Sequence, residues 1–323
     1  MPKQYMPFPE FSQSDKINLI QYFITGGATL FNQYREQMYN TYNTARNHFI
    51  NNPSELIEIE KFIFESVCDS VRNNIDEIVA DYNEASFLHP FWGDYPPENR
   101  GRSPIGDQIP WLEVGEHVVG HKIGRFLRDS FLIREVGMPT GPDDRYAMQS
   151  ASIASKNSIT NAAMLFLDTK SVGPRDDKDE VVVSPNQVSG DGVWVDPKLN
   201  VVNTKMIAKK SASHDFYPAA PPLFIFSNNV IAPVVHIYIK PIYKMLHLDN
   251  PLLRGQPLAK IRITCVPNGL LLTKNPNYLL TYPGLLYPGK DDKSKDPRKL
   301  RCRVDLRLLK SFAPWRYSEI IIP

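Results

Sequence analysis

The sequence predicts an α/β fold in which a mixed central β-sheet is flanked by helices and preceded by a helical N-terminal part. Three observations lead to this prediction: a helical pattern over residues 14–80, a second one over residues 111–132, and short apolar runs separated by prolines from residue 162 onward. The chain has 323 residues, of which 42% are hydrophobic and 22% charged, close to the average of globular proteins. We therefore expect one folded core with additions.

The first helical pattern predicts a packing layer or a dimer arm. In SELIEIEKFIFESV, the apolar residues Leu56, Ile59, Ile63 and Val67 recur at steps of three and four residues, as on one face of a helix. The preceding Asn-Asn-Pro-Ser is a helix start signal. We expect residues 1–82 to form a helical N-terminal subdomain.

A stretch rich in proline and glycine follows over residues 83–110, and it includes Arg100 and Arg102. Such composition predicts a loop. This loop could be an ordered connection, a DNA-wrapping loop or a domain boundary. Residues 111–323 would then form the core, integrated with the N-terminal part in one domain.

The core begins with the helical pattern of residues 111–132 and continues with strand patterns separated by turns. Glu113 and Glu116 project near the start of this helix. Proline, with 28 copies in the chain, suits many turns and surface loops between strands. The predicted strands are 162–170, 180–185, 192–196, 222–228, 234–240, 260–266, 300–309 and 318–323.

Composition excludes several classes of protein. The net charge of +2 gives no general affinity for nucleic acid, so basic residues would have to gather on one surface. Three cysteines without CxxC spacing argue for reduced thiols and against a disulfide framework or a zinc site. The sequence shows no signal peptide, no membrane-spanning run and no GxGxxG or Walker loop. We expect a soluble cytoplasmic protein without a membrane partner or a nucleotide cofactor.

One Asp-Xaa-Lys pair differs from the others in its context. The chain contains four such pairs, but only Asp168 and Lys170 continue a six-residue apolar run, AAMLFL. Strand alternation places both side chains on the same face, so opposite charges emerge side by side at a strand end. The alternative is a salt bridge that only closes the strand end.

A magnesium site for phosphodiester hydrolysis would use such a pair and a second acid. Magnesium is usually held by one or two carboxylates together with water and substrate phosphate, and a neighbouring ammonium can orient the attacking water. Pro142 is followed by two acids, Asp143 and Asp144, and the first of them lies 168 − 143 = 25 residues before Asp168. The intervening residues can form a hairpin-like return, and either acid can supply the second carboxylate.

These residues resemble a known family. Pro142-Asp143 followed by Asp168-Thr169-Lys170 is similar to the PD-(D/E)XK nuclease pattern, and DTKSVGPRD resembles type II restriction endonucleases of the BglI type. The resemblance implies a homodimeric enzyme that cleaves double-stranded DNA with Mg²⁺, for which Mn²⁺ can substitute. It also implies that the enzyme works in a bacterium or archaeon. It implies Asp143 and Asp168, with Thr169, at the metal and Lys170 beside the water. Asp144 competes with Asp143, and Glu113 or Glu116 would be the additional helix acid.

A nuclease that selects its site also needs side chains that contact bases. In residues 300–310, a period of two places Arg301, Arg303, Asp305 and Arg307 on one face of a strand and apolar residues on the other. Arginine binds guanine in a bidentate manner, and aspartate accepts from cytosine N4. An ordinary edge strand protected by charge has the same pattern.

Weaker candidates for DNA contacts lie elsewhere in the core. Lys260 and Arg262 alternate along a predicted strand and suit a phosphate-facing surface, while a half-solvated sheet would look the same. Asn186 and Gln187 carry amides suited to adenine, and a plain turn explains them equally well.

Three functions therefore remain open at this point. The first is a type II restriction endonuclease that cuts a short specific duplex sequence. The second is a DNA repair or recombination nuclease that recognises structure. The third is a DNA-binding protein without catalysis, in which Asp168 and Lys170 form only a salt bridge.

Overall fold

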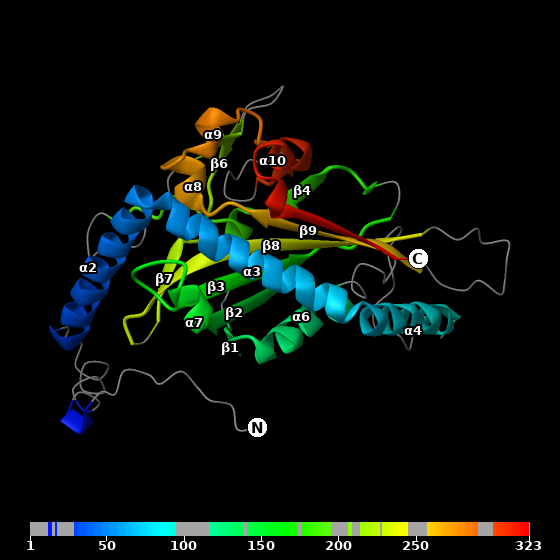
Figure 1. Cartoon of the computed structure of the whole chain (residues 1–323), viewed down its shortest axis with the longest axis horizontal. Helices are drawn as coiled ribbons and strands as arrows, with labels where there is room; N and C mark the ends of the chain where they lie inside the picture. The colour runs from blue at the N-terminus through cyan, green and yellow to red at the C-terminus, as the bar shows by residue number, and fades with distance from the viewer. Residues whose placement is uncertain are drawn as a thin grey trace.

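The computed structural model describes residues 12–14, 17, 29–94, 116–137, 141–173, 176–194, 206–208, 214–226, 228–244, 257–289 and 300–322. At its centre lies a seven-stranded sheet in the order β1-β2-β3-β8-β9-β12, with β7 paired to β8 (Figure 1). The strands are β1 (Leu132–Glu135), β2 (Asp144–Gln149), β3 (Ala162–Thr169), β7 (Leu223–Ile225), β8 (Ile231–Tyr243), β9 (Leu258–Val266) and β12 (Tyr317–Ile321). The pair β3–β8 is parallel and the other pairs are antiparallel. The predicted mixed sheet is confirmed.

Two smaller sheets lie beside the central one. The first has the order β10-β11-β4, and the second consists of β5 and β6. Their strands are β4 (Glu180–Val183), β10 (Leu286–Pro288), β11 (Cys302–Asp305), β5 (Met206–Ala208) and β6 (His214–Phe216). The three-stranded sheet has its own apolar cluster, which also includes Tyr238 of β8.

Helices flank the central sheet. The N-terminal ones are α2 (Thr29–Asn51), α3 (Pro53–Asn73) and α4 (Ile75–Asp94). The core contributes the π-helical turn η2 (Glu116–Gly120), α6 (His121–Phe126), η3 (Leu127–Asp129), α7 (Ala151–Ala154), η5 (Pro185–Gln187), α8 (Gly269–Thr273), α9 (Tyr278–Thr281), α10 (Leu306–Phe312) and η7 (Pro314–Arg316). Figure 1 shows α3 running across one face of the sheet, where it contacts β8, β9 and α6.

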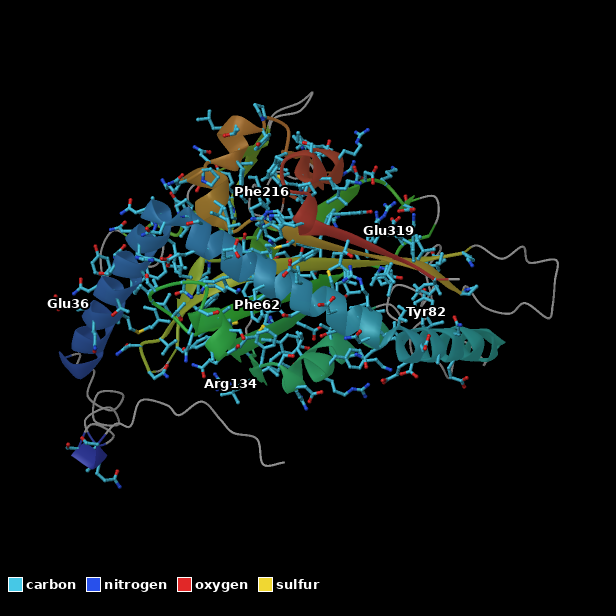
Figure 2. All side chains as sticks on the ribbon, in the orientation of Figure 1. Glu36, Phe62, Tyr82, Arg134, Phe216 and Glu319 are labelled. Carbon is cyan, nitrogen blue, oxygen red and sulfur yellow. The ribbon has the colours of Figure 1, made fainter. Side chains whose placement is uncertain are left out.

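The N-terminal helices share a hydrophobic core with the sheet. Leu56 and Ile59 of α3 belong to the same buried cluster as Leu165 of β3 and Ile237 of β8. Phe62, labelled in Figure 2, lies on α3 with its ring centroid 5.6 Å from that of Phe131, just before β1. The helical part is therefore packed onto the sheet rather than separated from it.

The predicted helix boundaries need two corrections. Helix α4 continues to Asp94, so the loop predicted over residues 83–110 is wrong for residues 83–94, while residues 95–110 lie outside the described ranges. The second helix was predicted over residues 111–132, but its described part consists of η2, α6 and η3 and ends at Asp129. Leu132 instead begins strand β1.

Most of the predicted strands are present. The exceptions are residues 192–194, the described part of one predicted strand, which belong to no named strand, and residues 306–309, which are helical. The sequence patterns miss strands β1, β2, β5, β6 and β10. In β2, DRYAMQ, buried residues occupy both faces and Arg145 interrupts them, so no period-two pattern marks the strand.

Two further findings bear on the class of protein. Cys68, Cys265 and Cys302 are free thiols, and all three are buried. Across the described ranges, none of the helices combines the length and apolar character that crossing a bilayer requires.

Candidate active site

The end of β3 carries the predicted charged pair. Every residue of β3 is buried, and Asp168 is only 1% exposed. The ammonium nitrogen Nζ of Lys170 lies 3.0 Å from Oδ2 of Asp168 and 3.1 Å from Oδ1. The Lys170 side chain keeps 38% of its surface exposed, so its charge also faces solvent. The two charges emerge side by side, as the sequence predicts.

Asp143 lies at the same end of the sheet, just before β2. Strands β2 and β3 pair in antiparallel register with Asp144 opposite Leu167, so one further step brings Asp143 opposite Asp168. The backbone N–H of Thr169 donates to Oδ2 of Asp143 at 3.1 Å. Because the Asp143 side chain is exposed, its carboxylate is open to solvent beside Asp168.

Asp144 occupies the other face of the sheet. Its carboxylate is 3% exposed, and its Oδ1 lies 3.0 Å from Nδ1 of His121. Burial raises the pKa of the Asp144 carboxyl, and the neighbouring His121 only partly offsets this rise. The geometry therefore distinguishes the two acids, and Asp143 is the one that lies beside Asp168.

The side chain of Thr169 also lies on the face of Asp144. A Cβ built on Gly120 would lie 2.8 Å from Oγ1 of Thr169 and 3.0 Å from Oδ2 of Asp144. Glycine at position 120 thus lets η2 approach this face closely. Because strand side chains alternate, Thr169 can offer only its backbone, and not its hydroxyl, on the face of Asp168.

Gln187 contacts Asp168 directly, which corrects its assignment as a DNA contact. Its Nε2 donates to Oδ1 of Asp168 at 2.5 Å, and its Oε1 accepts from the backbone N–H of Ser184 at 2.9 Å. With both ends of the amide engaged and 8% of its surface exposed, Gln187 is not placed to read a base. The sequence signal for this arrangement is Ser184-Pro-Asn-Gln187. It forms a capping box, in which the glutamine side chain bonds back to the backbone of Ser184.

A groove of about 450 Å³ begins at Lys170 and crosses to the three-stranded sheet. Basic side chains of Lys178, Lys240, Arg301 and Arg303 line it together with the acids Asp176 and Glu180. Arg303 places Nη1 3.3 Å from Oε1 of Glu180. The predicted proximity of Arg301 and Arg303 on one face is consistent with this groove, which joins the charged pair of β3 to both arginines.

The strand predicted over residues 300–309 is shorter than expected. Strand β11 ends at Asp305, and helix α10 begins at Leu306. Oδ1 of Asp305 accepts from the backbone N–H groups of Arg307 and Leu308 at 3.0 and 3.1 Å, so Asp305 is a helix N-cap. The expectation that Asp305 and Arg307 continue the face of a strand is wrong. The local signal was the aspartate itself, because Asp before an apolar run favours a helix start.

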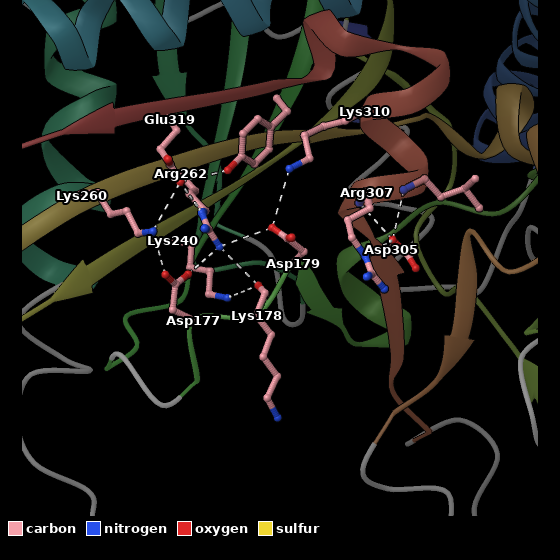
Figure 3. A network of polar contacts seen from close by, with 12 residues as sticks. Asp177, Lys178, Asp179, Lys240, Lys260, Arg262, Asp305, Arg307, Lys310 and Glu319 are labelled. Atoms are coloured by element: carbon pink, nitrogen blue, oxygen red, sulfur yellow. Dashed lines mark hydrogen bonds and ion pairs between the residues drawn. The ribbon is translucent and has the colours of Figure 1, made fainter.

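Lys260 and Arg262 belong to a network of ion pairs on β9. Nη1 of Arg262 lies 2.5 Å from Oδ1 of Asp177, and Nε of Arg262 lies 2.6 Å from Oε2 of Glu319 (Figure 3). Nζ of Lys260 lies 2.8 Å from Oδ2 of Asp177. Their charges are thus matched by acids, and the surface is not the bare phosphate-facing one that the alternation suggested. Burial alone would lower the pKa of Arg262, but the acids around it raise the pKa.

The network holds the segment between β3 and β4. Nζ of Lys240 donates to the backbone carbonyl of Lys178 at 2.8 Å, while Nζ of Lys310 lies 3.7 Å from Oδ1 of Asp179. Figure 3 shows the Lys178 side chain extending away from these contacts. The ion pairs therefore fix a backbone segment whose lysine lines the groove.

Three predicted site residues remain without a described role. Asn186 is half-buried within η5. Its side chain takes no part in the hydrogen bonds that join Gln187 to Ser184 and Asp168. Glu113 lies outside the described residues. Glu116 begins η2, but its side chain is not among those described.

The donor atoms at the end of β3 fit a hard divalent cation. Among the described residues, no group of three or more His, Cys, Asp and Glu side chains forms a ready-made metal cage. Asp143 and Asp168 nevertheless bring two carboxylates to one face, and the backbone N–H of Thr169 bonds to the first of them. Magnesium typically uses this kind of incomplete protein site and takes its remaining ligands from water and substrate phosphate.

A protein-family model described as restriction endonuclease BglI matches residues 37–320. The chain belongs to this family. It is 46% identical to the type II restriction enzyme BglI of Bacillus subtilis over 291 residues, covering 88% of this chain and 97% of that protein. The resemblance seen in the sequence is therefore confirmed, as is the predicted enzyme class, a type II restriction endonuclease.

Solved structures agree with this membership. The crystal structure of BglI bound to its DNA recognition sequence matches with a TM-score of 0.82 and 45% identity, covering 89% of this chain and 97% of that one. The structure of the tetrameric restriction endonuclease SfiI bound to cognate DNA matches with a TM-score of 0.50 and 12% identity, covering 83% of this chain and 85% of that one. The similarity to SfiI concerns the fold alone.

Proposed function

We propose that this BglI-family enzyme hydrolyses phosphodiester bonds within a short specific sequence of double-stranded DNA, with Mg²⁺ as its cofactor. The observation that carries the proposal is the meeting of Asp143, Asp168 and Lys170 at one end of the sheet, beside a groove lined by arginines. Two acids and one lysine match the needs of metal-assisted phosphate hydrolysis. The groove supplies donors suited to the base edges of DNA.

Asp143 and Asp168 would hold the cation through their carboxylates, with the carbonyl of Thr169 as a further oxygen. When bound, the cation would supply Lewis acidity at the scissile phosphate and lower the pKa of a water molecule. Mn²⁺ prefers similar oxygen ligands and is expected to substitute. The two carboxylates would attract the cation to the place where bound DNA brings a negatively charged phosphate.

Lys170 would act on the attacking water and on the phosphate. Its ammonium is held by Asp168 and stays partly exposed, so it can donate to an oxygen at the mouth of the groove. There it orients the water for in-line attack on phosphorus and offsets the negative charge that develops in the transition state. Its fixed position lowers the cost of ordering these groups during the reaction.

Arg301 and Arg303 would contact the DNA bases. Both line the groove that starts at Lys170, so a duplex held there would present its edge to them while a phosphate approaches Asp168. Guanine is the base that arginine binds best. Glu180 holds Arg303 in place, which restricts the directions in which this guanidinium can donate.

We further propose that the enzyme works in the cytoplasm as a homodimer. One active site per chain cuts one strand, and a two-fold symmetric pair would present one site to each strand. Sedimentation velocity at micromolar concentration should give twice the chain mass of 36.8 kDa. A monomer in the presence and absence of DNA would contradict the dimer and leave the assignment of the active site untouched.

The decisive experiment is cleavage of unmethylated phage DNA by the purified protein with Mg²⁺. Discrete fragments are expected, and they should be absent with Asp168→Ala and with Ca²⁺ in place of Mg²⁺. End sequencing of the fragments would give the recognition sequence. Cleavage of branched DNA without sequence preference would favour a repair nuclease, and binding without cleavage under any metal would favour a non-catalytic protein.

A further inference from the structure

We infer that Gln187 is a positioning residue of the active site, which fixes the Asp168 carboxylate in the orientation that a divalent cation requires. The inference rests on the proposed metal-dependent function of Asp168. Helix η5 lies outside the motif formed by Asp143, Asp168 and Lys170. The inference gives this turn a part in building the cation site.

The contact between the two side chains is short and buried. Nε2 of Gln187 lies 2.5 Å from Oδ1 of Asp168, and the two residues are 8% and 1% exposed. A hydrogen bond to an ionised carboxylate is stronger than one between neutral groups, and a low dielectric strengthens it further. The bond therefore restrains rotation of the carboxylate about its Cβ–Cγ bond.

The orientation of the Gln187 amide is fixed by a second contact. Its Oε1 accepts from the backbone N–H of Ser184 at 2.9 Å, as part of the capping box that begins η5. A backbone N–H can only donate, so the oxygen of the amide must face Ser184 and the nitrogen must face Asp168. The amide nitrogen of Gln187 consequently donates to Asp168.

Strand β8 anchors the same turn. The phenol of Tyr238 donates to the backbone carbonyl of Gln187 at 2.8 Å. Tyr238 pairs with Asp168 in the parallel register of β3 and β8, and it is 2% exposed. Asp168 and the residue that orients it are thus tied to the same pair of central strands, and the turn cannot shift without breaking a buried hydrogen bond.

The chemistry of an amide suits this position better than that of a cation. Lys170 already places one positive charge against Asp168. A second cationic donor would neutralise the carboxylate further and weaken its attraction for a metal ion, whereas a neutral amide orients the carboxylate and leaves its charge unchanged. Outer partners of this kind commonly change metal affinity by about 10- to 100-fold when removed.

The test replaces Gln187 with methionine, which keeps the length of the side chain and removes the donor. Binding of Mn²⁺ to the DNA-free protein is measured by calorimetry, and thermal unfolding is followed in parallel. We expect Gln187→Met to fold and to bind Mn²⁺ about tenfold or more weakly than the wild type. In cleavage assays, the Mg²⁺ concentration for half-maximal rate should rise by a similar factor.

Asn157→Leu provides the matched control. Asn157 is also an amide with both ends engaged, because Nδ2 donates to the carbonyls of Ile153 and Thr160 and Oδ1 accepts from two backbone N–H groups. It lies before β3, at the end of the strand away from Asp168. This variant should lose thermal stability and keep the Mn²⁺ affinity of the wild type. A general loss of stability therefore cannot mimic the expected result.

Two further variants separate the possible failures. Asp168→Ala should lose Mn²⁺ binding and cleavage, and wild-type behaviour in both assays would overturn the proposed function itself. If Asp168→Ala behaves as expected but folded Gln187→Met binds Mn²⁺ like the wild type, only the role of Gln187 is overturned. If Gln187→Met does not fold, Tyr238→Phe decides: weaker binding supports the inference, and unchanged binding overturns it.

Discussion

Asp143 and Asp144 are consecutive in the chain, yet their carboxylates serve opposite faces of the central sheet. Asp143 is exposed and accepts from the backbone of Thr169, opposite Asp168. Asp144 is buried against His121, on the face covered by η2 and α6. This difference follows from strand alternation, and it gives two neighbouring acids different expected roles.

The first prediction compares the two acids by the same substitution. Asp143→Asn should lower the cleavage rate by about a thousandfold, equivalent to about 4 kcal/mol of transition-state stabilisation, because one of two cation-binding carboxylates is lost. Asp144→Asn keeps the size of a buried side chain and should change the rate by less than about tenfold. Single-turnover cleavage at saturating enzyme measures both. Equal losses would show that the face of Asp144 also takes part in the reaction.

The second prediction concerns Lys170. Lys170→Met keeps the length of the side chain and removes the ammonium that lies 3.0 Å from Asp168. We expect the rate to fall by about 100- to 1000-fold, as for loss of a single group that stabilises charge in the transition state. DNA affinity, measured by gel shift with Ca²⁺, should change far less, because Lys170 is one of several cations at the groove. A parallel loss of affinity and rate would instead indicate a binding role.

The site motif could be predicted from the sequence because its signals are local. A long apolar run that ends in Asp-Thr-Lys identifies β3 and places Asp168 and Lys170 on one face by alternation alone. The register of β2 against β3 is not local, however. It depends on where the chain between the two strands turns, and so Asp143 and Asp144 could be separated only once Asp144 was seen opposite Leu167.

The surroundings of the site were harder to predict because they depend on long-range contacts. Gln187 reaches Asp168 across 19 residues, and Tyr238 reaches Gln187 across 51. Nothing in a single sequence records which amide lies against which carboxylate. Similarly, the alternation of Lys260 and Arg262 describes the strand but not the acids of neighbouring segments that match their charges.

The third prediction concerns selection of the DNA sequence. Arg301 is exposed at the groove, so Arg301→Ala should weaken binding of the cognate sequence by about 1–3 kcal/mol and relax the preference at one base pair. Arg128→Ala, in η3 outside the groove, removes the same charge and serves as the control. Competition between cognate and single-substituted duplexes measures the preference. Uniform weakening across all duplexes would mean that Arg301 contacts phosphate only.

The fourth prediction is an acid dependence of stability that originates in the network of Figure 3. Burial alone would raise the pKa of Glu319, but its hydrogen bond to Arg262, 2.6 Å away, and the charges around it lower the pKa below the ordinary value of 4.5. A carboxyl with a lowered pKa in the folded state stabilises the fold at pH values above 4.5. That stabilisation is lost as the pH falls through the lowered pKa, because protonation then favours the unfolded chain.

Glu319→Gln removes this contribution while keeping the size of the side chain. The variant should be less stable than the wild type at pH 7, and the difference between them should shrink as the pH is lowered below 4.5. Urea unfolding at a series of pH values measures the difference directly. Since Arg262 also holds Asp177 and the carbonyl of Lys178, loosening the network should reduce DNA affinity as well as stability. A difference in stability that stays constant down to pH 3 would show that the charge of Glu319 does not stabilise this segment.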